Sequence, residues 1–184
     1  MSSHKLNAAE AFPKTTVPCL SGNTLELGSP RAGKEWQAII VYRGKHCPLC
    51  TKYLKQLKGL ASQFSEAGVD VVVVSADTQE KAQAHAAGQL EMNVEVGYDL
   101  SIAQMQSLGL YISHPRSEQE TDRPFAEPGL IVVNEEGNVH VIDISNNPFV
   151  RPDLEQLLSG LNWIRNPDNN YPIRGTYPDG IIFR

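Results

Sequence analysis

The sequence predicts an α/β fold in which a central mixed β-sheet is flanked by helices and preceded by a β-hairpin. Two observations carry this prediction. Apolar runs rich in β-branched residues alternate with segments of helical periodicity over residues 37–90, as in parallel strand-helix-strand units. Two further apolar runs, at 130–133 and 139–144, flank a turn and are followed by an amphipathic segment.

The first part of the chain contains a polar arm and a short hairpin. Residues 1–16 have no apolar stretch of the length that a signal peptide needs. Apolar residues at 17–20 and 24–27 flank Ser-Gly-Asn, and a glycine in so short a turn predicts a hairpin. The apolar run at 37–42 predicts the first buried strand.

A long helix and a second strand follow. Residues 48–67 predict a helix that ends at Gly68, because apolar residues recur there at helical spacing, namely Leu54, Leu57, Leu60, Ala61 and Phe64. The β-branched run 69–74 predicts a strand covered on both faces. A capping box at 77–80 then predicts a helix that extends to about Leu90.

The second half predicts shorter elements. We expect a strand at 92–98, a helix at 101–108 closed by Gly109, and a polar loop at 113–127, which has two prolines and no periodicity.

The chain is expected to end in a helix and a tail. Four leucines on one face of 153–164 predict the last helix, and the tail covers 166–184, where the apolar Ile181, Ile182 and Phe183 suggest an anchored end. With 184 residues we expect one domain over 1–184 with its core at about 17–165.

Charge and cysteine content exclude several classes of function. The net charge is −5 and the sequence shows no Lys/Arg run, which argues against nucleic acid or an anionic membrane as a partner. No apolar run could span a bilayer, so we expect a cytoplasmic protein. Three cysteines do not make a secreted disulfide framework, whereas one close pair in a reducing compartment is typical of a catalytic or metal-binding site.

The close pair lies in the segment His46-Cys47-Pro48-Leu49-Cys50, between the first buried strand and the long helix. The unpaired N–H groups and positive end of a helix favour a thiolate there. A free cysteine titrates near ~8.5, and a Cys-x-x-Cys pair at a helix start falls to roughly 3.5–7.5. We therefore predict that Cys47, at an exposed helix start, attacks and that Cys50, inside the first turn, resolves.

The order of elements over 37–165 resembles the thioredoxin fold. More narrowly, Tyr42-Arg43-Gly44-Lys45-His46-Cys47-Pro48-Leu49-Cys50 resembles the Tyr-Arg-Gly-x-x-Cys-Pro-x-Cys signature of the peroxiredoxin-like branch of the AhpC/TSA (alkyl hydroperoxide reductase and thiol-specific antioxidant, redoxin) family. The preceding hairpin also belongs to that branch.

The resemblance implies an antioxidant thiol oxidoreductase with a dithiol-disulfide cycle between Cys47 and Cys50. Its substrate would be a peroxide or a protein disulfide, and a thioredoxin or glutathione-type partner would restore the dithiol. It implies no cofactor and no metal. Members of the family often dimerise, so a homodimer stays open. The resemblance also implies that Arg43 stabilises the thiolate or a polarised peroxide, and that Pro128 is a cis-proline facing Cys47.

Two positions depart from the related families. Typical peroxiredoxins have a threonine or serine three residues before the reactive cysteine, and a proline farther back, where this chain has Gly44 and Ile40. Thioredoxin-type motifs usually have tryptophan where this chain has His46, which we expect to raise thiolate character or to act as an acid or base.

Weaker candidates and two rival functions remain. Arg123, Arg151 and the loop residue His114 are secondary candidates, Cys19 is left unpaired, and His85 and His140 are expected on exposed faces. One rival is a copper- or zinc-binding thioredoxin-fold protein, although no second ligand pair completes a four-ligand site. The other is a non-catalytic redox-sensing module.

Overall fold

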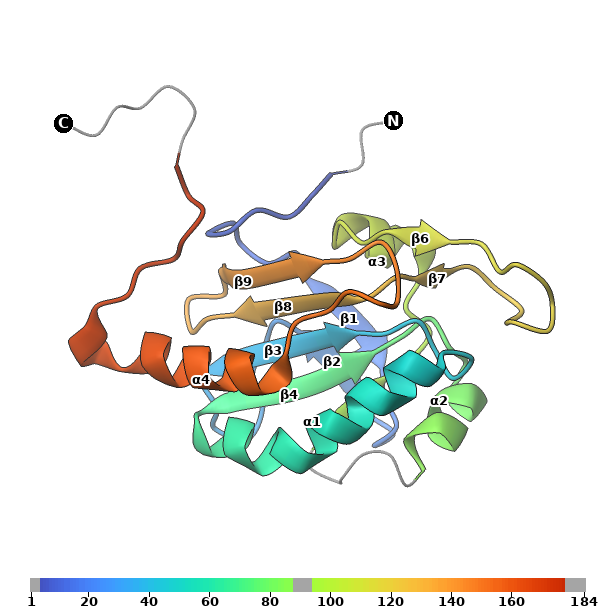
Figure 1. Ribbon diagram of the computed structural model, residues 1–184, viewed down its shortest axis with the longest axis horizontal. Helices are drawn as coiled ribbons and strands as arrows, with labels where there is room; N and C mark the ends of the chain where they lie inside the picture. The colour runs from blue at the N-terminus through green and yellow to red at the C-terminus, as the bar shows by residue number, and fades with distance from the viewer. Residues whose placement is uncertain (1–3, 88–93, 178–184) are drawn as a thin grey trace.

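A computed structural model describes residues 4–87 and 94–177 and shows one five-stranded mixed sheet in the order β5-β4-β3-β8-β9 (Figure 1). The strands β3–β4 and β4–β5 pair in parallel, whereas β3–β8 and β8–β9 pair antiparallel. These strands are β3 (Trp36–Val41), β4 (Val69–Val74), β5 (Glu95–Gly97), β8 (Gly129–Val133) and β9 (Val139–Ile144). The predicted mixed sheet is therefore confirmed, and β3 is its central strand.

Two hydrophobic clusters form on the two faces of this sheet. Side chains alternate across β3, so that Ile40 packs under the helices α1 (Pro48–Glu66) and α4 (Leu154–Arg165), while Ile39 faces the other layer. In Figure 1 both helices lie across the same face of the sheet. The opposite cluster is covered by the hairpin and α3, whose bounds are β1 (Thr15–Pro18), β2 (Thr24–Leu27) and α3 (Ile102–Ser107).

The helix ends follow local capping chemistry. The side chain of Thr78 caps α2 (Gln79–Ala86) by accepting from the Lys81 N–H, but Lys81 cannot return the bond, so the predicted capping box at 77–80 is wrong. A complete capping box instead joins Ser101 and Gln104 at the start of α3. The predicted end of α2 near Leu90 and the first residues of the predicted strand at 92–98 lie outside the described residues.

The predicted loop at 113–127 is closed at its base by a small hairpin. The strands β6 (Ile112–Ser113) and β7 (Phe125–Ala126) pair antiparallel, which places the two ends of the loop side by side. The prediction of structureless chain is therefore wrong at the ends of the loop. β7 runs on through Pro128 into β8, and this continuity fixes the loop to the sheet beside the end of β3.

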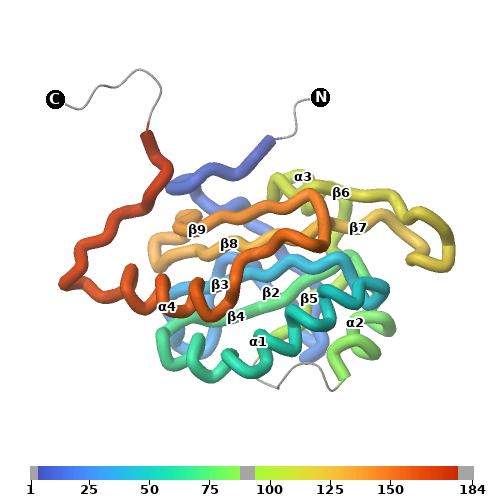
Figure 2. Tube along the Cα trace, in the orientation of Figure 1, coloured from blue at the N-terminus to red at the C-terminus, as the bar shows by residue number. Residues whose placement is uncertain are grey.

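The N-terminal arm and the C-terminal tail flank the edge strand β9. The arm, drawn in blue in Figure 2, follows this edge, and Ala9 donates to the carbonyl of Val139 at 2.8 Å. The tail contains a short 3₁₀ turn, η1 (Pro167–Asn169), after α4. The apolar residues 181–183, which were expected to anchor the tail, lie outside the described residues, and the extent of the domain stays a prediction there.

In the described part of the chain, no helix has the length and apolar composition needed to cross a membrane.

The helix layer predicts a clear contrast between neighbouring positions on α1. Leu57 is fully buried under the helix, and Gln56 beside it is exposed. Leu57→Ala should lower the free energy of unfolding by about 2–5 kcal/mol, since it leaves a cavity in the core. Chemical denaturation measures this, and Gln56→Ala, expected to change stability by less than about 0.5 kcal/mol, is the matched control. Equal effects of the two variants would contradict the packing described here.

Candidate active site

Cys47 lies where the central strand passes into the longest helix. It occupies the N-cap position of α1, and Pro48 takes the first helical position, which needs no N–H. The Cys47 sulfur accepts a hydrogen bond from the Cys50 backbone N–H at 3.2 Å. A cysteine side chain therefore caps this helix, a role that serine or aspartate fills in most helices. The strand-to-helix placement predicted for the motif is confirmed.

The two cysteines of the motif differ in acidity. Hydrogen bonds from the Cys50 thiol and backbone N–H, together with Arg43, lower the pKa of Cys47 to about 6, against the opposing effect of burial. The pKa of Cys50 is raised, because its thiol donates to Cys47 and because it is buried. Both are free thiols in the structure. At neutral pH the pair therefore holds one thiolate, on Cys47, and one thiol, on Cys50.

Both sulfurs are buried, which corrects the expectation of an exposed Cys47. The relative exposure of Cys47 is 1% and that of Cys50 is 0%, and both belong to the cluster beneath α1. The reason is the cap itself: the Cys47 side chain turns back over the first turn of its own helix instead of pointing into solvent. Any molecule that reaches either sulfur must therefore displace or pass the groups around the helix start.

Arg43 lies beside Cys47 in the loop between β3 and α1 and is itself held by carboxylates. Its Nε lies 3.0 Å from Glu127 and its Nη2 lies 3.8 Å from Glu120, and its guanidinium covers the ring of Phe125 at 4.7 Å. The loop 113–127 thus closes over one side of the motif. Two acidic side chains offset the positive charge of Arg43, so that its effect on Cys47 is moderated.

His46 is neutral at physiological pH. Burial, assisted by the nearby Arg43, lowers its pKa to about 4. The imidazole packs edge-on against Phe125 with 4.6 Å between ring centroids, and both of its nitrogens are buried without a hydrogen-bond partner. A neutral ring adds no charge beside Cys47, and the roles expected of His46 stay predictions.

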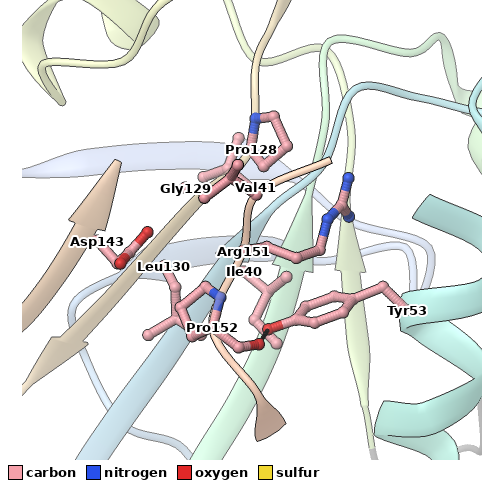
Figure 3. Close-up of a pocket in the computed structure, with 10 residues that line it drawn as sticks. Ile40, Val41, Tyr53, Pro128, Gly129, Leu130, Asp143, Arg151 and Pro152 are labelled. Carbon is pink, nitrogen blue, oxygen red and sulfur yellow. Dashed lines mark hydrogen bonds between the residues drawn. The ribbon is translucent and has the colours of Figure 1, made fainter. Parts of the chain in front are cut away.

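Pro128 is not a cis-proline, because the described residues contain no cis peptide bond. The trans chain continues straight from β7 into β8, held by two hydrogen bonds: Glu127 donates to the Tyr111 carbonyl at 2.8 Å, and Ser145 donates to the Pro128 carbonyl at 2.9 Å. This corrects the expectation from the resemblance. Pro128 instead lines a small pocket on the Cys50 side of the motif (Figure 3).

Arg151, predicted only as a secondary candidate, lies next to the second cysteine of the motif. Its Nη2 lies 3.5 Å from the Cys50 sulfur and donates to the Pro148 carbonyl at 2.9 Å. Figure 3 shows its side chain passing over the ring of Tyr53, at 5.0 Å from the ring centre, while the Tyr53 hydroxyl donates to the Pro152 carbonyl at 2.6 Å. The pocket between them holds about 10 Å³, the space of roughly one water molecule.

A different arginine therefore lies next to each cysteine of the motif. Arg43 lies beside Cys47, and Arg151 lies beside Cys50. In the sequence, Arg151 is recognisable only as an arginine just before the last amphipathic helix. The path of that segment over the sheet cannot be predicted from the local sequence pattern.

The remaining candidates do not join the site. Arg123 pairs with Asp99 at 3.3 Å and donates to the Ala76 carbonyl, and His114 is exposed. The left-over Cys19 packs on the opposite face of the sheet from Cys47.

The two histidines expected on exposed faces are covered. His85 is buried, with its Nε2 2.8 Å from the Thr51 hydroxyl, and His140 is half-buried against Trp36 with 4.5 Å between ring centroids. Across residues 4–87 and 94–177, no three His, Cys, Asp or Glu side chains gather closely enough to hold a metal ion.

Gly44 shapes the loop that presents Cys47. Its φ is +140°, and a Cβ built on it would lie 2.7 Å from the Asp77 carboxylate. That carboxylate accepts from the Lys45 N–H at 2.7 Å, while the Gly44 carbonyl accepts from the Cys47 N–H at 3.1 Å. The space that a threonine or serine side chain would need at position 44, as in typical peroxiredoxins, is therefore occupied by Asp77. The loop requires glycine at this position.

Substitution at Gly44 should therefore strain the loop. We expect Gly44→Ala to lower the free energy of unfolding by roughly 1–3 kcal/mol, because the new Cβ meets both an unfavourable φ and Asp77. Gly59→Ala is the matched control: Gly59 lies in α1 with open space around it, and alanine should stabilise the protein by about 0.5–1 kcal/mol. Denaturant melts measure both, and a neutral Gly44→Ala would refute the proposed constraint.

Comparison with known proteins identifies the family. The family model described as Redoxin matches residues 7–158. A search of the curated proteins found no match.

Solved structures share the fold at low sequence identity. A mutant of peroxiredoxin 6 from Arenicola marina has a TM-score of 0.72 at 14% identity, over 89% of this chain and 75% of its own. A peroxiredoxin-like protein from Aquifex aeolicus has a TM-score of 0.71 at 18% identity, over 86% and 87%. Peroxidoxin BcpB from Mycobacterium tuberculosis has 0.69 at 16%, over 87% and 99%. The strand order, the Cys47 site and the family match agree, and the chain belongs to the Redoxin (AhpC/TSA) family, with a peroxiredoxin-like thioredoxin fold.

Proposed function

We propose that this protein is a thiol-dependent antioxidant oxidoreductase that uses a dithiol-disulfide cycle between Cys47 and Cys50. The observation that carries the proposal is the pairing of unlike sulfurs at one helix start. The Cys47 thiolate, with a pKa of about 6, accepts the N–H of Cys50, whose own pKa is raised. Such a pair provides a nucleophile and a reserve thiol within one turn of helix.

With a peroxide the cycle balances in two steps. The Cys47 sulfur attacks one peroxide oxygen, the O–O bond breaks, and the departing oxygen takes a proton to leave as alcohol or water. Cys47 is then a sulfenic acid. Cys50 loses its proton and attacks the Cys47 sulfur, forming the disulfide and releasing water. Arg151, 3.5 Å from Cys50, favours the thiolate needed for this step.

With a protein disulfide, the same two sulfurs act in the same order. The Cys47 thiolate forms a mixed disulfide and releases one substrate thiol, and Cys50 then displaces the second. Both routes end in a Cys47–Cys50 disulfide, which a dithiol partner of the thioredoxin type, or glutathione, would reduce by two electrons. A reducing compartment such as the cytoplasm would keep the pair as thiols between cycles.

The loop at Gly44 bears on the choice between these substrates. No side-chain hydroxyl stands three residues before Cys47, and the adjacent space is filled by Asp77. A peroxide would therefore lack the hydrogen-bond donor that typical peroxiredoxins provide, which weakens the case for a fast peroxidase and favours disulfide exchange.

Thiolate formation at Cys47 can be tested through pH. The pKa of about 6 lies below the ordinary thiol value, so the thiolate is present above pH ~6 and is lost as the pH falls through that value. The rate of alkylation of Cys47 by iodoacetamide in the unsubstituted protein, distinguished from that of Cys50 by tandem mass spectrometry, should rise with a midpoint near 6. Arg43→Gln should move this midpoint upward, because it removes the cation and leaves Glu127 unpaired.

The control for this pH profile is Arg174→Gln, an exposed position in the tail, which should leave the midpoint unchanged. Far-UV circular dichroism should show that Arg43→Gln remains folded. A midpoint near 8.5 in the parent protein would contradict the activated thiolate.

Turnover itself is tested by stopped-flow loss of thiols after mixing the reduced protein with hydrogen peroxide or with a disulfide substrate such as insulin. We expect oxidation faster than that of free cysteine by at least about tenfold with one of them, abolished in Cys47→Ser. Cys50→Ser should still react once but should stop at a sulfenic acid or a mixed disulfide. Rates equal to free cysteine with both oxidants would discard the proposal in favour of a metal-binding or non-catalytic role.

A further inference from the structure

We infer that the outer face at the start of α1 is the docking surface for an acidic dithiol protein that reduces the Cys47–Cys50 disulfide. This inference rests on the proposed function and names the chemistry of its partner. We call the surface the lysine face, and it consists of Lys45, Pro48, Leu49, Lys52, Lys55 and Lys58.

The charges on this face oppose those of the whole chain. Although the net charge is −5, no Asp or Glu occurs from residue 36 to residue 65, and the lysines of the face fall within that stretch. Helical spacing brings Lys52 and Lys55 to one side of α1, where both are exposed. These two lysines, with Lys45 and Lys58, form no ion pair with the described residues.

Neighbouring elements offset only part of this charge. The Asp77 carboxylate, which accepts from the Lys45 N–H at 2.7 Å, is buried. The exposed Glu80 at the start of α2 is an acidic group on the adjacent helix, while Lys81 is paired with Asp122 at 2.6 Å. Thr51 and His85, which join α1 to α2, are neutral at physiological pH, since burial lowers the pKa of His85. The surface beside the motif therefore stays cationic.

Large apolar side chains are exposed at Leu49 in the motif and at the two residues that precede Arg151. Leu49, between the two cysteines, is 36% exposed. Phe149 and Val150 are 82% and 60% exposed, and they directly precede Arg151, which contacts Cys50. Exposed apolar groups bordered by charge are typical of a protein interface, where an apolar centre is surrounded by a polar rim.

The length of the charged surface favours a protein over a small thiol as the reductant that docks there. An α-helix rises 1.5 Å per residue, so Lys58, which is half-buried, lies about 12 Å along the axis from Cys50. A molecule the size of glutathione that attacks the disulfide would not reach that far with its own carboxylates. A protein with acidic residues around its dithiol could contact the apolar centre and the lysines together.

The test compares reductants that differ only in charge. Oxidised protein is mixed with dithiothreitol, or with one of two peptides that share a Cys-Gly-Pro-Cys core and carry either Glu or Lys on both flanks. Return of the thiols is followed by rapid acid quench and alkylation. The acidic peptide should reduce the disulfide about tenfold faster than the basic one at low salt, and this advantage should disappear at high salt.

Variants separate docking from chemistry. Lys52→Glu and Lys55→Glu, singly and together, should remove most of the acidic peptide's advantage while the rate with dithiothreitol stays unchanged. Lys14→Glu is the matched control, since Lys14 is exposed just before β1, whose hairpin packs on the opposite face of the sheet, and it should leave every rate unchanged.

Each result decides between the two claims. Equal rates for the acidic and basic peptides, or a loss with dithiothreitol as large as with the acidic peptide, would overturn the docking surface and leave the redox cycle intact. A protein that forms no disulfide reducible by dithiothreitol would overturn the proposed function, and the docking inference with it.

Discussion

The hydrogen bond from the Cys50 N–H to the Cys47 sulfur is the interaction on which the site depends. It begins α1, it selects Cys47 as the thiolate, and it turns that sulfur into the protein interior. A helix start capped by serine would hold its shape equally well. The use of a thiol couples the geometry of the fold to its redox state, because oxidation of Cys47 replaces an anionic acceptor with a disulfide sulfur, which accepts more weakly.

The two arginines divide the motif into two halves with different tasks. Arg43 is held by Glu127 and Glu120, so its field at Cys47 is moderated and its position is fixed. Arg151 is joined to a backbone carbonyl and to the ring of Tyr53, with no carboxylate partner among the described residues, and is directed at Cys50. The sulfur with the raised pKa is thus the one that faces the cation without a carboxylate, and in the proposed cycle this cation would favour the Cys50 thiolate.

Helices and strands that a local sequence pattern determines were predictable from the sequence, whereas contacts between distant segments were not. The β-branched run of β4 and the leucines of α1 predicted their elements to within a residue or two, because burial and periodicity are local properties. The contact between Arg151 and Cys50 joins residues 101 apart. Likewise, Pro128 stands between β7 and β8, whose strand partners β6 and β3 are set by pairing and not by the residues next to the proline. The lysine face was not predicted from the sequence, because its lysines form a cluster only on the surface of the folded protein.

Burial of both sulfurs has a consequence for selectivity. A cysteine that is 1% exposed is protected from chance oxidation, so it reacts only with a molecule that is small or that can displace its neighbours. At the Cys47 side, the Asp77 carboxylate stands against Gly44, at the position where typical peroxiredoxins carry a hydroxyl. At the outer side, the lysine face and exposed Leu49 offer binding energy to a protein surface. Under the proposed docking, that energy would offset the cost of opening the first turn of α1, and the selectivity of this site would then lie in the docking step and not in the intrinsic reactivity of its thiolate.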